Sequence, residues 1–348
     1  MILVTMTVLL LSPLAQLASQ TGTHDSLIAV LQRTGDAKER IRLCLDIAMA
    51  YPRDQHAQAI AYAEEALKRA ETAEREADIA DACFTLAKLH FRLEKFSEAD
   101  PFIRRAVDIR RKSGATADLT EAFSLLRAIT RIIGEPDEAL RYAREVWVLE
   151  QQTKDTSRVI DALLTIADCH LQPQAYDSAL AYCDRARELA TRTADTTALV
   201  RTYLTLTQIH LARRDQIMAA EAGNRAVGLC NARVPKDYAA QAQFFLAWAY
   251  HRMRLDAEAI DHFQKAIVLH EEADNLHGVV NSLISASPMY FIIGDTARAL
   301  TNLEHALSIS REARDPGCTN RALFALARYY GERRMYTKAF PYCLLYTS

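Results

Sequence analysis

The sequence predicts an all-α protein, a right-handed solenoid of about eight antiparallel helix pairs. Glycine and proline are scarce, with ten and nine in 348 residues, so tight turns are few. Alanine recurs at intervals of forty residues without a slip in register, at Ala59, Ala99, Ala139, Ala179, Ala219, Ala259, Ala299 and Ala339. A fixed period of this kind is typical of repeat architectures, in which each unit buries its apolar faces against its neighbours.

A second small residue follows each of the first seven alanines after seven positions, and it is alanine in every case except Val146. Residues seven apart lie two helical turns apart on one face. Two helices that pack closely need small side chains where their backbones approach, and a leucine there would overpack the contact at a cost of about 1–3 kcal/mol. The alanine pairs therefore mark the predicted helix crossings.

Each forty-residue unit contains two amphipathic stretches, as residues 79–118 illustrate. Apolar residues at Ile79, Cys83 and Leu86 follow helical spacing in the first stretch. Ser97 is placed to cap the second helix, and Gly114 suits the left-handed residue that ends it. The same pattern predicts units that start near Glu39, Leu119, Val159, Leu199, Ala239, Val279 and Thr319. Pro288, inside one first helix, predicts a bend or an interruption.

The domain organisation follows from these boundaries. Residues 1–20 contain an uncharged apolar run at 2–11, which is too short to span a bilayer and predicts a secretory signal peptide, although no Lys or Arg precedes it. Residues 21–38 predict a lead-in helix capped by Asp25. The eight repeats occupy residues 39–348. No later segment is apolar or long enough to cross a membrane.

Several functional classes find no support in the sequence. The formal net charge is −2 with both signs mixed, so no basic stripe for nucleic acid stands out. Phosphate-binding glycine loops, HExxH and GxSxG are all missing, so we expect no enzyme and no cofactor. The seven cysteines have no CxxC or Cys/His metal spacing, which predicts small hydrophobes and no metal site.

Three histidines, His90, His170 and His210, share one repeat register. Equivalent atoms of adjacent helices in a stack lie on the order of 10 Å apart, whereas zinc ligands lie about 2 Å from one ion. The register therefore favours a packing role over a shared metal site. Trp147 occupies a position that holds Val107, Val227, Ile267 and Leu307 in other units, so we expect a core residue there.

The pattern resembles the tetratricopeptide repeat. The conserved small residue of that family, early in the second helix, matches Ala59 through Ala339, and its leucine in the first helix matches Leu86, Leu126, Ile166, Leu206, Leu246 and Leu326. Its tyrosine near the end of the first helix matches Tyr250, Tyr290 and Tyr330. The forty-residue period is six longer than the common repeat, and the closing proline is missing. The chain is similar to the N-terminal, extracytoplasmic arrays of bacterial sensor proteins.

The resemblance implies that one face of the first helices lines a concave groove that binds a protein or peptide segment. Trp248 belongs to that face, since its equivalents in other units are as varied as Lys88, Asp168 and Arg328. It either contacts a ligand or covers a neighbouring helix. Aromatic and arginine side chains are typical of binding hot spots. The candidate groove residues are Phe84, Lys88, Phe91, Arg92, Arg131, Phe244, Trp248, His251, Arg252 and Phe291.

We therefore expect a non-catalytic scaffold, the sensing region of an exported signalling protein in the periplasm or another extracytoplasmic space. A cytoplasmic regulator that binds a signalling peptide is the alternative if residues 1–20 are not a signal. We expect the last repeat to be truncated, because its second helix stops soon after Ala339 at "PYCLLYTS". A kinase or regulator output domain beyond residue 348 is a further expectation from the resemblance.

Overall fold

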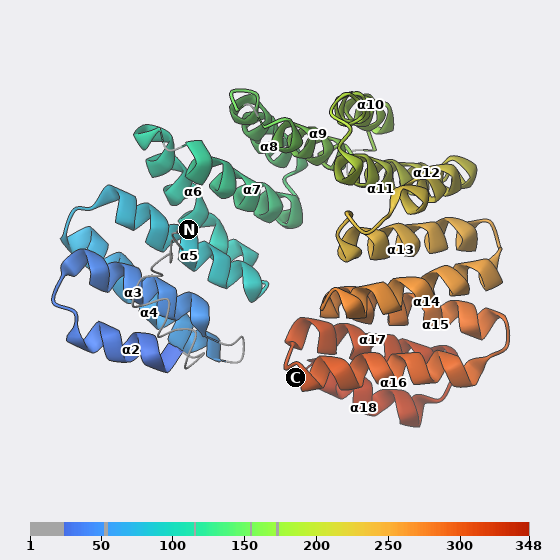
Figure 1. Ribbon diagram of the computed structural model, residues 1–348. Coiled ribbons are helices and arrows are strands. Elements are labelled where there is room, and N and C mark those ends of the chain that lie inside the picture. The colour runs from blue at the N-terminus through green and yellow to red at the C-terminus, as the bar shows by residue number, and fades with distance from the viewer. Residues whose placement is uncertain (1–23, 52–54, 115, 154, 172–173, 348) are drawn as a thin grey trace, which may run out of the picture. The chain divides into compact units, whose positions relative to one another are not determined.

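The computed structural model describes residues 24–51, 55–114, 116–153, 155–171 and 174–347, and over these residues every regular element is a helix (Figure 1). The fold class predicted from the sequence is therefore correct. The lead-in helix is α2 (His24–Arg33). The predicted signal segment, residues 1–20, lies outside the described residues. Among the described helices none is long and apolar enough to cross a bilayer.

The other sixteen described helices alternate as the first and second helices of eight repeats. The first helices are α3 (Ala37–Ala50), α5 (Glu76–Arg92), α7 (Thr116–Ile133), α9 (Thr156–Cys169), α11 (Thr196–Arg213), α13 (Lys236–Arg252), α15 (Leu276–Ile292) and α17 (Pro316–Glu332). The second helices are α4 (His56–Thr72), α6 (Phe96–Ser113), α8 (Pro136–Glu150), α10 (Tyr176–Arg192), α12 (Gln216–Leu229), α14 (Asp256–Glu272), α16 (Thr296–Glu312) and α18 (Tyr336–Thr347).

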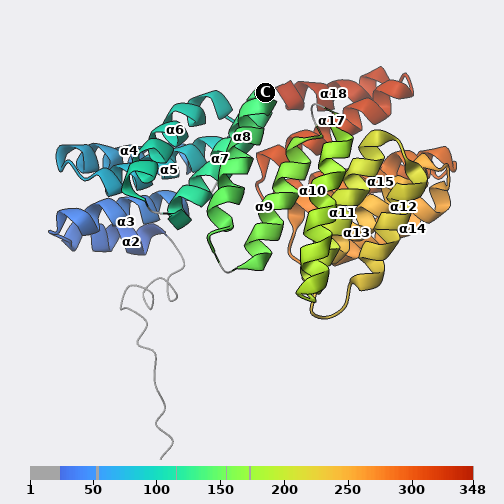
Figure 2. The ribbon, with the colours of Figure 1, turned by 90° about the horizontal axis from the view of Figure 1, so that it is seen from above.

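The chain divides into two compact units within α8, residues 1–142 and 143–348. In both units, helices that follow one another in the chain pack together, as Figure 2 shows for α9, α10 and α11. The first helices of consecutive repeats also touch: α3, α5 and α7 in the first unit, and α9, α11, α13, α15 and α17 in the second. The first helices thus form an inner layer in each unit, with the second helices outside it.

Small side chains lie at the helix crossings of every repeat. All eight period-forty alanines are buried, and Ala99, Ala179, Ala219, Ala259 and Ala299 have no exposed surface at all. The residues seven positions after the first seven of these alanines are buried as well, including Val146. Larger apolar residues fill the space between the crossings, for example Phe263 and Ile103, both fully enclosed. The core is therefore a series of similar small clusters, which is the expected property of a stack of repeats.

A left-handed residue follows twelve of the seventeen described helices, and these residues are spaced by twenty or forty positions. Positive φ occurs at Gly114, Gly134 and Gly294 and at the non-glycine positions Glu74, Glu94, Gln174, Ala194, Arg214, Arg254, Asp274, Arg314 and Arg334. The amide after the left-handed residue then reaches back over the last turn, as where Asp195 N donates to the Ala190 carbonyl at 3.0 Å. Gly114 has the predicted conformation, with φ of 71°.

Three sequence predictions about individual helices are contradicted. Asp25 does not cap α2, because that helix already begins at His24 and Asp25 lies in its first turn. Ser97 does not cap α6, because that helix already begins at Phe96, after Lys95, and Ser97 lies in its first turn. Of the bend or interruption predicted at Pro288, the interruption is absent, because α15 continues through it to Ile292. The neighbours of Pro288 are buried in the core, Met289 at 1% and Tyr290 at 3% exposure, so packing holds the helix together despite the missing N–H donor.

Candidate binding face of the second unit

The inner layer of the second unit carries a row of equivalent positions near the ends of its first helices. Trp248 on α13, Pro288 on α15 and Arg328 on α17 lie forty residues apart in the chain and on helices that contact one another. Two hollows adjoin this row, one at Trp248 and one at Pro288 and Arg328. We call the surface around these two hollows the inner face of the second unit.

The first hollow, of about 390 Å³, is open and mostly polar in its lining. Its residues are Gln216, Trp248, His251, Arg252 and Arg254. Arg252 and Arg254 are exposed, so the two arginines place positive charge at its rim. The His251 Nδ1 lies 2.6 Å from Asp256 Oδ1, which fixes the orientation of the imidazole ring. The hollow can thus accept a ligand that carries a carboxylate or phosphate group next to an apolar group.

Trp248 is half-buried, and its ring contacts residues on two elements. It meets the Phe263 ring edge-on at 5.9 Å between centroids and the His251 ring at 5.7 Å. Phe263 is fully buried in α14, so Trp248 does cover a neighbouring helix. It also lines the open hollow. The structure thus shows the covering role: part of the indole packs on the core, and the rest borders the hollow, where contact with a ligand stays a prediction.

The second hollow is a smaller cavity of about 50 Å³ between α15 and α17. Phe291 is 44% exposed and borders it together with Pro288 and Tyr329. The full lining is Ile284, Ser287, Pro288, Phe291, Leu303, Ala325, Arg328, Tyr329, Glu332 and Arg333. Arg328 Nε lies 3.7 Å from Glu332 Oε1, so these two charges largely offset one another.

Arg333 is the most distinctive residue of this cavity. Its guanidinium stacks between two aromatic rings, 3.7 Å from the Phe291 centroid and 3.6 Å from the Tyr329 centroid. Nη1 donates to the Tyr329 carbonyl oxygen at 2.7 Å. Nη2 is buried and has no hydrogen-bond partner within the described protein. A buried donor without a partner costs about 1–3 kcal/mol, so an incoming acceptor group would gain this contact.

One groove candidate of the second unit remains, Phe244, which packs on the same core cluster as Trp248, whereas Trp147 was predicted as a core residue. Phe244 is partly buried, edge-on to Phe245 at 5.4 Å and to Phe263 at 5.5 Å between centroids. Trp147 is partly buried against the core of the second unit, with the Arg185 guanidinium over its ring at 5.2 Å. Trp147 therefore belongs to a core cluster but is not enclosed by it.

The candidates of the first unit form a separate group with a different environment. Phe84 is only 7% exposed, because the Arg110 guanidinium lies over its ring at 4.4 Å and Lys88 Nζ at 5.2 Å. Lys88 Nζ also lies 3.7 Å from Glu121 Oε1. Phe91 is partly buried and meets Phe96 edge-on. Arg92 on α5 and Arg131 on α7 are partly buried too.

Sequence reasoning missed several residues of the inner face. Arg328 can be predicted from the sequence, because it occupies the repeat position of Trp248. Tyr329, Arg254 and Arg333 cannot be predicted in this way. Arg254 and Arg333 lie in the turns after their helices. Their position depends on how neighbouring repeats meet, which a periodic pattern does not report.

The three register-sharing histidines are buried packing residues. His90 stacks on Phe102 and His170 on Tyr182, each at 5.7 Å between ring centroids. Burial lowers the pKa of His90, His170 and His210 from their ordinary value of 6.5. The neutral rings therefore act as aromatic members of the hairpin cores, at the position that Tyr250 and Tyr330 take elsewhere.

Comparisons with known proteins agree with this architecture. A tetratricopeptide repeat family model matches residues 80–113. The quorum sensor NprR from B. thuringiensis, in its apo form, is similar in structure, with a TM-score of 0.56 and 13% identity over 93% of this chain and 91% of that one. A Rap protein complexed with competence and sporulation factor has a TM-score of 0.50 and 15% identity, covering 86% of this chain and 83% of that one.

A third similar structure is the signal transduction ATPase with numerous domains (STAND) protein PH0952 from Pyrococcus horikoshii, which has a tetratricopeptide repeat sensor. Its TM-score is 0.55 at 15% identity, and the match covers 95% of this chain but only 48% of that one. No curated protein sequence matches. At these identities the structural likeness concerns the fold. The family model covers one repeat of the chain, and the forty-residue register extends the same helix-pair pattern over the other repeats.

Proposed function

We propose that the chain is a non-catalytic scaffold that binds a peptide or protein segment along the inner face of its second unit. The observation that carries the proposal is the juxtaposition of Trp248, Phe291 and Arg333 beside two hollows on adjacent first helices. Aromatic and arginine anchors in pockets are typical of interface hot spots. The surface is preformed by packed helices, so binding needs little rearrangement of the protein.

The chemistry of the face favours a segment with both apolar and acidic groups. Trp248 and Phe291 offer partly open aromatic surface. Arg252, Arg254 and Arg333 add positive charge, and Glu332 is the single acidic residue among those that line the two hollows. A carboxylate beside an apolar side chain would therefore match the face better than a basic segment. The similar structures include a quorum sensor and a protein complexed with a sporulation factor, which agrees with a peptide ligand for this chain as well.

A selection from a random peptide library against the full chain tests the proposal. Selected peptides are titrated by calorimetry into the native chain and into Trp248→Ala, Arg333→Ala and Phe340→Ala variants. We expect Trp248→Ala and Arg333→Ala each to weaken binding by about tenfold or more, because each removes an anchor of the face. Phe340 is an exposed aromatic residue on α18 that lines neither hollow, so Phe340→Ala serves as the control and should leave the affinity unchanged. Equal affinities for the native chain and both second-unit variants would refute the assignment.

We further propose that this scaffold is the sensing part of an exported bacterial signalling protein. The apolar run at residues 2–11 and the small residues near Ser19 support export. N-terminal sequencing of the mature protein from its native host tests this: a start near Gln20 or Thr21 is expected. Recovery of the chain with residues 1–20 intact in the cytoplasm would instead favour the alternative, a cytoplasmic regulator that binds a signalling peptide. The similarity to the quorum sensor NprR is the observation that keeps this alternative open.

A further inference from the structure

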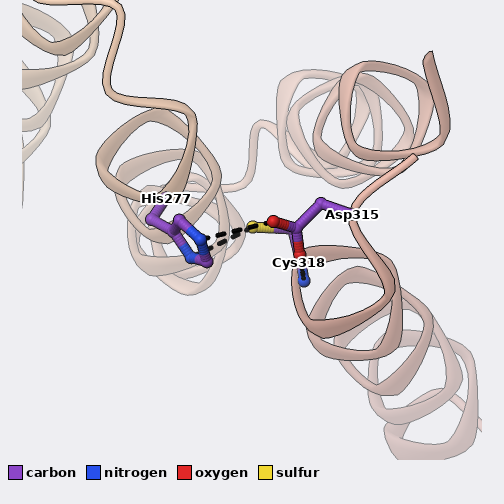
Figure 3. Close-up of side chains that lie close together, drawn as sticks. All are labelled: His277, Asp315 and Cys318. Carbon is purple, nitrogen blue, oxygen red and sulfur yellow. Dashed lines mark hydrogen bonds and ion pairs between the residues drawn. The ribbon is translucent and has the colours of Figure 1, made fainter. Parts of the chain in front are cut away.

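A cluster of metal-ligating residue types lies at the seam between the last two repeats, away from the inner face. His277 projects from the first turn of α15, and Asp315 and Cys318 stand at the start of α17. Figure 3 shows the imidazole pointing across the seam at the thiol and the carboxylate. One ligand atom from each of the three residues lies within 4.8 Å of the other two.

The distances fit one small cation. Tetrahedral zinc with bonds of about 2.0–2.3 Å places neighbouring ligand atoms roughly 3.3–3.8 Å apart. His277 Nδ1 lies 3.3 Å from Cys318 Sγ, and the other ring nitrogen, Nε2, lies 3.3 Å from Asp315 Oδ2. A cation bound through one ring nitrogen therefore has one of these two partners at tetrahedral spacing, with the third ligand atom within 4.8 Å. The carboxylate is held in place, because Asp315 Oδ1 accepts the Cys318 amide at 2.9 Å as the cap of α17. Only the exposed imidazole borders solvent, where a water could supply a further ligand.

A second observation is that the His277 nitrogen and the Cys318 sulfur both face one positively charged group, the Arg321 guanidinium. Arg321 Nη2 lies 2.7 Å from His277 Nδ1 and 3.0 Å from Cys318 Sγ. One positively charged donor thus meets the nitrogen and the sulfur together. Arg321 is not held by these contacts alone, since its Nη1 donates to Asn281 Oδ1 at 2.6 Å. The guanidinium can therefore turn towards Asn281 and leave the position.

The seam between α9 and α11, earlier in the second unit, has equivalent hydrogen bonds and ion pairs but no histidine or cysteine at these positions. There, Ser157 Oγ donates to Asp195 Oδ2 at 2.9 Å, at the positions of His277 and Asp315. Ala198 takes the place of Cys318, and Arg201, in the place of Arg321, pairs with Asp161. The link between repeats thus needs neither imidazole nor thiol. At the last seam, both replacements introduce zinc ligands at one point.

We propose that His277, Asp315 and Cys318 bind Zn²⁺ at this seam and that the metal displaces the Arg321 guanidinium. The thiol binds as a thiolate and releases one proton to solvent for each zinc bound. Zn²⁺ is offset by the thiolate and the carboxylate, and the displaced guanidinium keeps its charge beside Asn281, so the four side chains and the metal together gain one positive charge. The metal would join α15 to α17 and so stabilise the contact between the last two repeats.

Titration of the full chain with Zn²⁺ against a chromophoric chelator tests the proposal. We expect one zinc per native chain, and loss of that zinc in Cys318→Ser and in His277→Ala. Arg321→Ala should bind zinc at least about tenfold more tightly, because it keeps all three ligands and removes the competing cation. Cys343→Ser is the matched control for a cysteine outside the cluster, and its zinc binding should equal that of the native chain.

A second readout separates loss of ligands from loss of folding. Co²⁺ should give the sulfur-to-metal charge-transfer absorption of a thiolate ligand in the native chain and in Arg321→Ala. That band should be missing from Cys318→Ser, while helical circular dichroism stays native. If neither the native chain nor Arg321→Ala takes up zinc, the proposal is wrong. It is equally wrong if Cys318→Ser and His277→Ala both bind zinc as the native chain does.

Discussion

The inner layers of the two units contain similar residue types in different states. In the first unit, Phe84 is covered by Arg110 and Lys88. Both cations already have acidic partners, Asp81 at 2.9 Å and Glu121 at 3.7 Å. In the second unit, Trp248 and Phe291 border open hollows, and the buried Nη2 of Arg333 has no hydrogen-bond partner in the described protein. Composition alone therefore does not identify a binding face; the availability of the side chains does.

The largest expected effect concerns the stability of these two aromatic positions. Phe84→Ala should reduce the free energy of unfolding by about 3–5 kcal/mol, because the ring is enclosed. Trp248→Ala should cost clearly less, since its indole is only partly buried and borders the open hollow. Urea unfolding followed by circular dichroism measures both. A larger loss for Trp248→Ala than for Phe84→Ala would remove the distinction between a covered and an open face.

The alanine register should behave alike in the two units. Ala99→Leu in the first unit and Ala259→Leu in the second should each destabilise by about 1–3 kcal/mol, because both alanines are fully buried at helix crossings. The exposed helical alanines Ala77 and Ala257 are the matched controls, and leucine there should change stability by less than about 0.5 kcal/mol. If the buried and exposed substitutions had equal effects, the crossings would not depend on small side chains.

Two glycines of the second unit test the same packing argument in one chain. A Cβ at Gly278 would lie 2.3 Å from the Nδ1 of the buried His270, whereas nothing lies within 4 Å of a Cβ at Gly228. We expect Gly278→Ala to destabilise by about 1–3 kcal/mol, since α15 and the His270 ring must move apart. Gly228→Ala, in a helix, should stabilise by about 0.5–1 kcal/mol. Thermal melting curves of the two variants check the opposite signs.

The smallest effect is a difference in acid sensitivity between the units. Burial lowers the pKa of His90 in the first unit and of His170, His210, His262 and His270 in the second. The unfolded chain, with histidines near 6.5, then binds more protons than the folded chain as pH falls below that value. Full stability is therefore present above pH 6.5 and is lost as pH falls towards the lowered values.

The second unit, with four such histidines against one, should lose more stability. Hydrogen exchange measured at about pH 7.5 and at about pH 5.5, expressed as protection factors, checks this by helix. An equal loss of protection in both units would contradict it.

Sequence periodicity predicts those features that each repeat shares. Local spacing predicts the alanine register, the forty-residue unit and the order of the helices, because each repeat packs its helices in the same way. The ends of the helices are harder to predict. Nine residues other than glycine adopt positive φ, such as Ala194 and Arg214, since the turn between packed helices imposes it. Serine is a common capping residue, but Ser97 lies in the first turn of α6 and not before the helix.

The features that differ between repeats are the ones the sequence does not locate. Trp248 was found because its position varies from unit to unit. Arg333 and the His277, Asp315 and Cys318 cluster were not, because each depends on long side chains that meet across two repeats. Partners that lie about forty residues apart in the chain, such as His277 and Cys318, form no motif that can be recognised locally in the sequence. To locate candidate sites in such arrays, one therefore needs the geometry of the contacts between repeats as well as the alignment of the repeats.

Fluorescence of Trp248 tests the central claim most directly. The chain has two tryptophans, so Trp147→Phe leaves Trp248 as the single reporter on the inner face of the second unit. Addition of a library-selected peptide should shift and change its emission along the same binding curve that calorimetry gives, because the peptide displaces water from the indole. Peptide binding by calorimetry with unchanged Trp248 emission would place the ligand elsewhere and contradict the account.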